Sequence, residues 1–193
     1  MKCDYEKVLE MLDSEGLINF TRELIQINSV FDSEDEDANE SRVAQYVFDF
    51  LKKEGFEVYI EDAVKNRPNV IAFLRGEDSG KTILFEGHTD VVSAGDYEQW
   101  TYDPFGGEIV EVDGKKRIYG RGSCDTKQNL AAAVYAVKAI KDAKEKFSGN
   151  ILLCIPCDEE GLMLGIKSFI NNGWADKVDA AVICEPEEKN LCI

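Results

Sequence analysis

The spacing of apolar residues changes along the chain, and this change limits the fold more strongly than any other feature. In residues 17–27 and 43–51 the apolar side chains recur at steps of three or four, which predicts two amphipathic helices. From residue 56 on they gather in short runs, and residues 56–60, 69–74 and 82–87 are typical of strands. The chain therefore begins with helices and continues into a strand-rich region.

Helical spacing returns in the second half of the chain and alternates with further strands. The Asp113–Gly114 pair is typical of a tight hairpin turn and joins residues 108–112 to residues 116–120. The segments that follow are a helix over 130–140, a strand over 150–156, a helix over 166–173 and a strand over 179–184. Strands separated by helices predict one α/β domain with a largely parallel or mixed sheet.

Two segments resemble ligand-binding loops without matching them. Residues 76–82, GEDSGKT, lack one residue between the glycines of a phosphate-binding loop, and a strand follows them in place of the required helix. We expect a hairpin turn there. The acidic run over residues 31–40, FDSEDEDANE, lacks the glycine-centred spacing of a calcium loop. It is predicted to be a solvated loop that leads into the second helix.

Length and charge exclude several classes of protein. The 193 residues are 44% hydrophobic, which suffices for one compact domain with a substantial core. Lys plus Arg number 22 against 38 Asp plus Glu, and the net charge of -16 opposes binding to nucleic acid and to anionic membranes. The sequence shows neither a signal peptide nor an apolar run long enough to cross a bilayer, so we expect a soluble, cytoplasmic protein.

The six cysteines do not require a disulfide framework, because a chain of this size without a signal peptide builds an ordinary core. We expect reduced thiols. Cys154 and Cys157 form a C-x-x-C inside an apolar run, and no second pair at matching spacing accompanies them. They are predicted to be small buried side chains at the end of a strand.

The only histidine, His88, limits the chemistry that the chain can perform. No G-x-S-x-G sequence is present, and a serine or cysteine nucleophile would need His88 as its base. His88 follows an apolar strand, at the position where open α/β sheets place ligand sites. Asp90 lies two residues on, where its carboxylate can orient the imidazole. Taken alone, the two residues are better explained as a hydrogen-bonded structural pair than as part of a ligand site.

Acidic residues follow three other strand-like segments. They are Asp125, the run Asp158, Glu159 and Glu160, and Glu185. Carboxylates that converge at strand ends repel one another unless cations neutralise them. One imidazole with several carboxylates suits zinc, cobalt or manganese. Each cluster alone fits a solvated loop, but together they predict a metal site.

Five short motifs in a fixed order carry a resemblance to a known family. GHTDVV, Trp100 with DPF, YGRGSCDTK, DEEG and CEPE resemble the metallopeptidase family of acetylornithine deacetylase, succinyl-diaminopimelate desuccinylase, carboxypeptidase G and aminoacylase. The resemblance extends from about residue 17 to the end of the chain. It implies a three-layer α/β/α zinc-peptidase-like catalytic domain with a mixed sheet, present only in part.

The resemblance also implies the ligands of two divalent metal ions. His88 and Glu185 would bind the first ion, Glu160 would bind the second, and Asp125 would bridge both. The ions would be zinc, with cobalt or manganese as alternatives. Two cations held about 3.5–4 Å apart can polarise a carbonyl and acidify a water molecule.

Two further carboxylates would act beside the metals according to the same resemblance. Asp90 would orient His88, and Glu159 would be the general base that takes a proton from the attacking water and delivers it to the leaving amine. The implied reaction is hydrolysis of the amide bond of a small N-acyl amino acid or peptide. Deacetylase, desuccinylase and dipeptidase activities remain alternatives within this one mechanism.

Several departures from the family pattern bear on the substrate and on the extent of the chain. Ser93, Cys124, Thr126 and Cys184 replace residues that are common in the family, which weakens a substrate assignment by analogy. Family members continue with a lid or dimerisation domain and a later histidine that completes the second metal. We therefore expect residues 1–193 to be the N-terminal portion of a catalytic domain whose full-length form could be a homodimer. The alternative is a catalytically incomplete metal-binding fragment with a structural or regulatory role.

Overall fold

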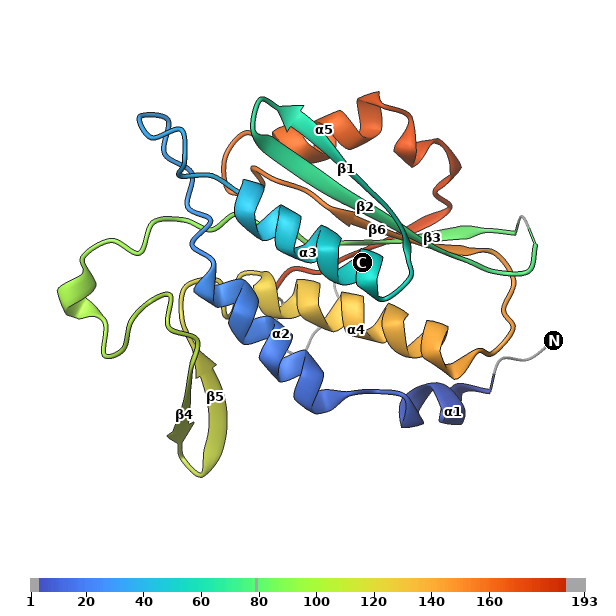
Figure 1. Cartoon of the computed structure of the whole chain (residues 1–193), viewed down its shortest axis with the longest axis horizontal. Coiled ribbons are helices and arrows are strands. Elements are labelled where there is room, and N and C mark those ends of the chain that lie inside the picture. Colours follow the sequence, from blue (N-terminus) through green and yellow to red (C-terminus); the bar gives the residue numbers. More distant parts are fainter. Residues whose placement is uncertain (1–3, 79, 187–193) are drawn as a thin grey trace.

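The computed structural model describes residues 4–78 and 80–186, and a five-stranded sheet forms its centre. The strands are β1 (Glu57–Val64), β2 (Arg67–Arg75), β3 (Thr82–Glu86), β6 (Asn150–Ile155) and β7 (Ala180–Ile183). Their order across the sheet is β1-β2-β6-β3-β7 (Figure 1). β2 runs antiparallel to β1 and β6, whereas β3 runs parallel to β6 and β7. The prediction of a mixed sheet is confirmed.

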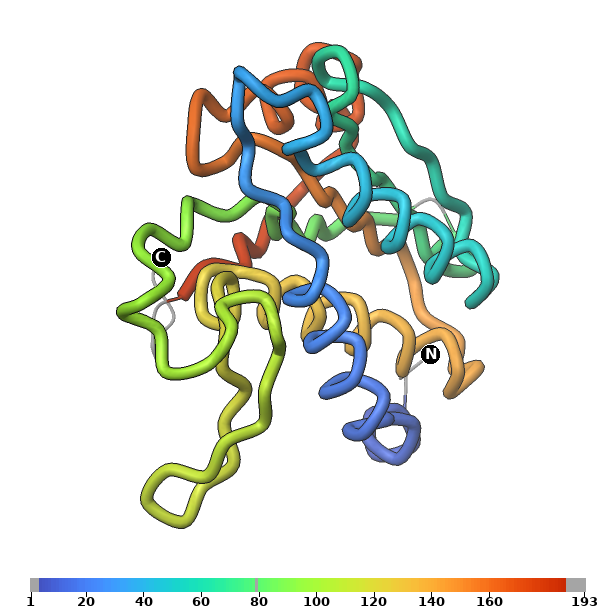
Figure 2. Tube along the Cα trace, turned by 60° about the vertical axis from the view of Figure 1, so that its left-hand side comes forward, coloured from blue at the N-terminus to red at the C-terminus, as the bar shows by residue number. Residues whose placement is uncertain are grey.

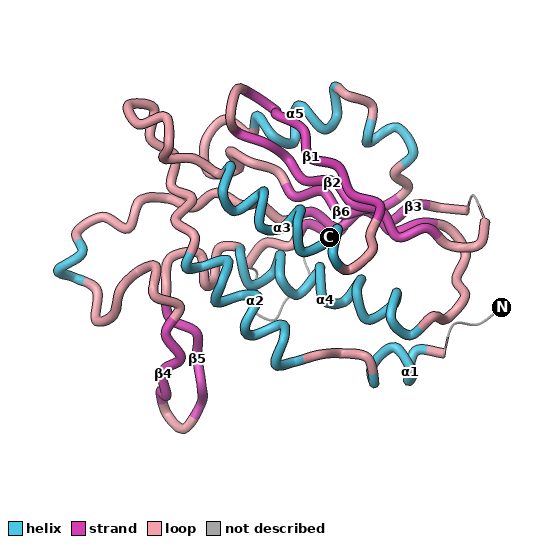
Figure 3. The backbone as a smooth tube through the Cα atoms, in the orientation of Figure 1, coloured by secondary structure: helices cyan, strands magenta, loops and turns pink. Residues whose placement is uncertain are grey.

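Helices cover both faces of this sheet. α2 (Ser14–Gln26), α3 (Ser41–Lys53) and α4 (Lys127–Ala143) lie on one face, and α5 (Leu164–Asn171) lies on the other (Figures 1 and 3). Phe20 and Val134 belong to the core beneath the three helices, and Phe169 of α5 packs with Ile71 and Leu84 on the opposite face. The architecture is the three-layer α/β/α arrangement predicted from the sequence. The short helix α1 (Tyr5–Glu10) lies beside α4.

Local sequence explains how these elements form. α2 begins after Asp13, whose carboxylate accepts the backbone N–H of Gly16 at 2.8 Å and so caps the helix. Its apolar face buries Phe20 and Leu24, and each such side chain stabilises the fold by about 1.5–3 kcal/mol relative to exposure. β6 is buried over nearly its whole length, since both faces of the sheet are covered. This explains why its apolar run does not alternate with polar residues.

A second, two-stranded sheet projects away from the main body (Figures 1 and 2). β4 (Glu108–Val112) and β5 (Lys115–Tyr119) pair antiparallel and are joined by Asp113 and Gly114. Both turn residues have positive φ, 52° and 71°, as a tight hairpin turn of the primed type requires. The hairpin predicted from the Asp-Gly pair is confirmed.

The predicted hairpin turn at residues 76–82 is wrong. β6 lies between β2 and β3, so the connection from β2 to β3 passes over the end of another strand. The segment packs against the turn that leads into β6, and Asp78 Oδ1 accepts hydrogen bonds from Ser148 Oγ and the Gly149 backbone N–H, each at 2.9 Å. The position of β6 depends on pairing between distant parts of the chain, which short-range turn signals do not report.

The acidic run over residues 31–40 is only partly the solvated loop that was predicted. Residues 31–37 are exposed, but Asn39 is buried and Glu40 has no solvent-accessible surface. Glu40 is buried because Arg67 neutralises it, as described below.

The cysteine prediction is confirmed for the two residues of the C-x-x-C. Cys154 and Cys157 are completely buried free thiols, one in β6 and the other just after it. Cys3 and Cys192 lie outside the described residues. Throughout the two described ranges, helices fall short of the length and apolar character needed to cross a membrane.

Candidate metal centre

The carboxyl ends of three parallel strands bring the candidate residues together. β6, β3 and β7 run in the same direction, so the loops that follow them meet at one edge of the sheet. The loop after β3 carries His88, the loop after β6 carries Glu159, and the segment after β7 carries Glu185. Asp125 joins them from the residues just before α4.

The imidazole of His88 is the centre of this cluster. Its Nε2 atom lies 3.2 Å from Asp125 Oδ1, 3.6 Å from Glu185 Oε1 and 3.7 Å from Glu159 Oε2. One ligand atom each from His88, Asp125 and Glu185 lies within 4.8 Å of the other two. Catalytic zinc sites have three protein ligands, and one imidazole nitrogen with two carboxylate oxygens meets this count with ligand types that zinc accepts.

An unpartnered oxygen provides the test of whether a cation fits here. Glu185 Oε1 is buried, and within the described part of the chain it has no hydrogen-bond partner. A buried carboxylate oxygen without a donor is costly, and it faces the Nε2 atom of His88. A divalent cation between these groups would neutralise the Glu185 carboxylate and accept the lone pair of the His88 nitrogen. The residues present therefore fit the implied metal.

Burial and mutual repulsion shift the pKa values of the carboxyl groups. Burial raises the pKa of Glu185 to about 7, and the charges of Asp125 and Glu159 add to this against the opposing charge of His88. Burial and the charge of Asp125 also raise the pKa of Glu160. The cluster is thus one in which carboxylates resist ionising together unless a positive charge is present.

The neighbouring carboxylates raise the pKa of His88. Burial by itself lowers this pKa, but the hydrogen bond and charge of Asp90, with the charges of Glu185 and Glu159, raise it to about 9. The protein environment therefore favours a positive charge at this point. A metal ion would compete with the proton, because an imidazole nitrogen must be deprotonated to bind metal.

Asp90 connects His88 to the loop that follows β6. His88 Nδ1 lies 3.0 Å from the backbone oxygen of Asp90 and 3.5 Å from its Oδ1 atom, so the carbonyl is the closer partner of the ring. The carboxylate of Asp90 accepts the backbone N–H groups of Glu159 at 3.0 Å and Glu160 at 2.9 Å. Asp90 therefore holds the loop as well as facing the imidazole.

Asp125 is placed by the residues that start α4. The ammonium group of Lys127 is completely buried and donates to the carbonyls of Leu24 and Ile27 at the end of α2, both at 2.8 Å. The hydroxyl of Thr126 donates to the carbonyl of Cys184, which precedes Glu185. Two of the residues that depart from the family pattern thus contact each other and tie the start of α4 to the end of β7.

Glu160 lies apart from the group of three ligand atoms. The residue is exposed. Partial burial of its carboxyl group raises the pKa of Glu160, and the negative charge of Asp125 raises it further, which links Glu160 to the cluster. Among the described residues, Glu160 is therefore outside the group of three whose ligand atoms lie within 4.8 Å of one another.

Comparison with known proteins identifies the family of the chain. Residues 84–192 match the model of Peptidase family M20/M25/M40. The chain belongs to this family. The matched range contains all the candidate site residues, and the family resemblance inferred from the motifs is confirmed.

Relatives within the M20/M25/M40 family are longer than this chain. The chain is 35% identical over 167 residues to a probable succinyl-diaminopimelate desuccinylase of Staphylococcus aureus (strain MRSA252), covering 86% of this chain and 39% of the relative. It is 33% identical over 184 residues to the succinyl-diaminopimelate desuccinylase of Orientia tsutsugamushi, covering 91% and 44% respectively. The chain thus spans less than half the length of these relatives.

Solved structures of two dipeptidases share the fold. The dipeptidase Dug1p from Saccharomyces cerevisiae superposes with a TM-score of 0.78 at 27% identity, covering 95% of this chain and 41% of that one. Human carnosine dipeptidase 1 superposes with a TM-score of 0.73 at 26% identity, covering 92% and 40%.

Sequence reasoning missed several buried charged residues near the centre. Glu86 is 5% exposed at the end of β3, and burial followed by the charge of Glu185 raises its pKa to about 7. Lys127 could have been found, because it continues the helical spacing of Leu130 and Val134 on the buried face of α4. Its place on an apolar stripe was a signal of burial.

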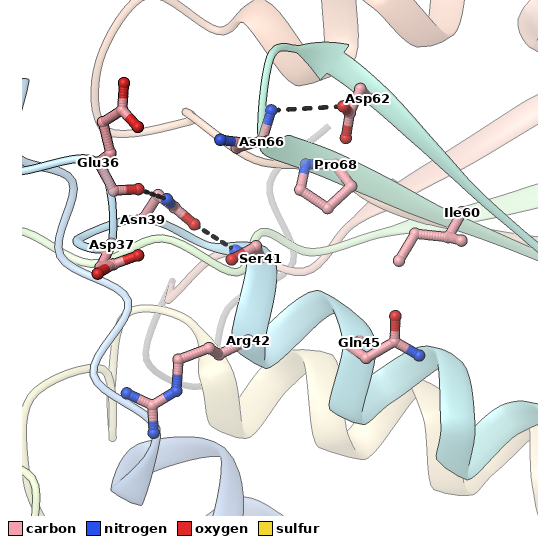
Figure 4. Close-up of a pocket in the computed structure, with 10 residues that line it drawn as sticks. All are labelled: Glu36, Asp37, Asn39, Ser41, Arg42, Gln45, Ile60, Asp62, Asn66 and Pro68. Carbon is pink, nitrogen blue, oxygen red and sulfur yellow. Dashed lines mark hydrogen bonds between the residues drawn. The ribbon is translucent and has the colours of Figure 1, made fainter.

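Two hollows differ in their relation to the centre. A cavity of about 170 Å³ adjoins it and is lined by Glu86, Pro156, Cys157, Glu159, Met163, Ile166, Ile183 and Glu185. A larger hollow of about 770 Å³ lies between the start of α3 and the β1–β2 turn (Figure 4). Several of its polar groups bond to each other, as Asn39 does to Glu36 O and Ser41 N, and none of the candidate ligands lines it.

Proposed function

We propose that this chain supplies most of the catalytic site of a metal-dependent amide hydrolase that cleaves N-acyl amino acids or short peptides. The observation that carries the proposal is the buried, unpartnered Oε1 atom of Glu185, which faces His88 within a cluster that includes Asp125. Membership of the M20/M25/M40 peptidase family supports the reaction class.

The residues present suggest how two ions would be held. His88, Asp125 and Glu185 would hold the first, and Asp125 with Glu160 would contribute to the second. When bound, the pair of ions would supply Lewis acidity for the scissile carbonyl and for the attacking water. Zinc, cobalt and manganese all suit this set of ligands.

Glu159 is the proposed general base. Its Oε2 atom lies 3.7 Å from His88 Nε2, and its backbone is fixed by Asp90. It would take one proton from the water whose oxygen attacks the carbonyl carbon. It would then deliver that proton to the nitrogen as the carbon–nitrogen bond breaks, so that an acid and an amine leave.

The surroundings of Glu159 support a small substrate. The cavity of about 170 Å³ beside it is lined mainly by apolar side chains, including Ile166 and Ile183. Such a space accommodates a small group next to the reacting bond. The relatives described above comprise desuccinylases and dipeptidases, and both substrate classes remain within the proposal.

The proposal includes that residues 1–193 are the N-terminal portion of the catalytic domain, so it is tested with the full-length protein that contains the whole domain. Purified protein depleted of metal and reloaded with zinc, cobalt or manganese is assayed against N-succinyl amino acids, N-acetyl amino acids and dipeptides. We expect metal-dependent release of a free amine from one of these classes, and loss of that activity with chelator. Absence of hydrolysis across the whole panel at full metal occupancy would contradict the proposed function.

A further inference from the structure

A buried charged cluster adjoins the loop that carries Glu159, and the proposed chemistry does not use it. The guanidinium of Arg67, at the start of β2, lies between the carboxylates of Glu40 and Asp158. Their side chains are 7%, 0% and 7% exposed respectively. We propose that Arg67 is a positioning residue that holds the loop of residues 158–164 so that Glu159 faces His88.

The contacts of Arg67 require the planar fork of an arginine. Its Nε atom donates to Glu40 Oε2 at 2.8 Å, and its Nη2 atom donates to Glu40 Oε1 and, at 2.7 Å, to Asp158 Oδ1. The ring of Phe31 covers the guanidinium at 3.7 Å from the ring centroid. A lysine carries the same charge but cannot bind the Glu40 carboxylate through two N–H groups while it also pairs with Asp158.

Asp158 transmits this anchoring to the loop. Its Oδ2 atom accepts the backbone N–H groups of Leu162 at 3.0 Å and Leu164 at 3.2 Å, so the loop folds around its carboxylate. Its own backbone N–H donates to Glu40 Oε1 at 3.2 Å, and its φ of 62° starts the turn. The loop is tight: a Cβ atom on Gly161 would lie 2.7 Å from Asp158 Oδ1.

Two carboxylates therefore hold the loop that carries Glu159 at different points. Asp90, after β3, binds the N–H groups of Glu159 and Glu160, and Asp158, held by Arg67, closes the rest of the loop. A general base acts only within hydrogen-bond reach of its proton, and a displacement of about 1 Å can lower the rate by about 10²-fold. Arg67 thus acts on the reaction through Asp158, without touching substrate.

The test compares two arginines of the same strand. Arg67→Lys keeps the charge and loses the fork. Arg75→Lys is the matched control, because Arg75 lies at the other end of β2 and forms a similar fork with Glu57, its Nε and Nη2 atoms each 2.6 Å from a carboxylate oxygen. Hydrogen–deuterium exchange of the metal-loaded full-length protein is followed for residues 158–164 and, separately, for β6. Steady-state kinetics are measured on the same preparations.

The proposal expects a local effect in Arg67→Lys. Amide exchange in residues 158–164 should rise by about tenfold or more while β6 stays within about twofold of the parent. With zinc saturating, kcat should fall by about 10²-fold while KM changes by less than about threefold. Arg75→Lys should match the parent in every measurement.

Other outcomes overturn the inference. Unchanged exchange in the loop, or an equal rise in β6, assigns Arg67 a merely structural role. Unchanged kcat with a loosened loop shows that the loop does not position Glu159. If Arg67→Lys does not fold, Asp158→Asn replaces it, because it keeps the size of the side chain and removes the charge that Arg67 binds. The inference rests on the proposed function, but the exchange measurement does not depend on activity. If the parent protein hydrolyses none of the substrates, the proposed function is refuted, and the exchange data still test whether Arg67 holds the loop.

Discussion

The carboxylate of Asp90 accepts the backbone N–H of Glu159 at 3.0 Å, so the residue beside the candidate metal ligand also fixes the proposed general base. The pair joins the ends of two parallel strands, β3 and β6, which are neighbours in the sheet. The proposed metal binding and proton transfer would therefore depend on one connection and not on two independent loops.

Asp90→Asn is predicted to disturb both functions of this residue. An amide has one acceptor oxygen, so one of the two N–H groups of Glu159 and Glu160 would face an NH₂ group. We expect the free energy of unfolding to fall by about 1.5–3 kcal/mol, the range for hydrogen bonds to a charged group. We also expect kcat of the full-length protein to fall by about 10²-fold. Urea unfolding and steady-state kinetics measure the two effects.

Asp96→Asn is the control for this substitution. Asp96 is exposed and also accepts a backbone N–H, from Glu98 at 3.0 Å. The control should leave kcat unchanged. An Asp90→Asn protein that is as stable and as active as this control would show that the connection does not matter.

His88→Ala, Asp125→Ala and Glu185→Ala are each predicted to weaken binding of the first metal ion. Loss of one of three ligands leaves an incomplete shell around a dication, and the effect should exceed the ~10–100-fold typical of partners that do not touch the metal. Isothermal titration with zinc measures the affinity. Glu111→Gln, in the exposed β4–β5 hairpin, removes a carboxylate charge without touching the cluster and should bind as the parent does. Parental affinity in all three variants would show the ligand assignment to be wrong.

Glu159→Gln is predicted to separate metal binding from hydrolysis. The glutamine keeps the shape of the side chain and the backbone bond to Asp90, but it cannot accept a proton. The full-length variant should retain its metal content and lose kcat by about 10²–10⁴-fold. Metal analysis and kinetics on one preparation test this. Retained activity with normal metal content would transfer the proton-transfer role to another residue.

The sequence was sufficient to predict most of the helices and strands and the convergence of most of the candidate site residues. Buried faces of α2 and α4 leave a three- to four-residue repeat, and strands covered on both sides leave short apolar runs, so each could be recognised locally. Acidic residues after such runs had to meet at one edge, because parallel strands end together. His88, Glu159 and Glu185 were accessible to this argument, whereas Asp125 follows β5 of the separate hairpin and reaches the centre from the residues just before α4.

Pairings between distant segments were not accessible in this way. Glu40 looked like one more acid in an exposed run, and Arg67 followed a turn-like Lys-Asn pair. They meet Asp158 only because β2 pairs antiparallel with β6, which brings the start of one strand to the end of the other. The insertion of β6 between β2 and β3 also depends on pairing between distant segments. It separates β2 from β3, and for that reason the hairpin prediction for residues 76–82 was wrong.

The 193-residue chain itself is predicted to bind one divalent ion more tightly than a second. The first site has an imidazole and two carboxylates, whereas the second has the carboxylates of Asp125 and Glu160 and no further histidine from this sequence. Three ligands match a catalytic zinc site, and two leave the second ion under-coordinated. Hydrolysis by a two-metal mechanism needs both ions, so turnover of N-acyl amino acids by this chain should be negligible.

The test is the zinc content per chain, measured after gel filtration for the parent and for the His88→Ala variant. The ratio of zinc to protein should be close to one for the parent and lower for the variant. Two tightly bound ions together with robust hydrolysis would contradict the ligand count, because the chain would then complete the second site with residues other than those proposed.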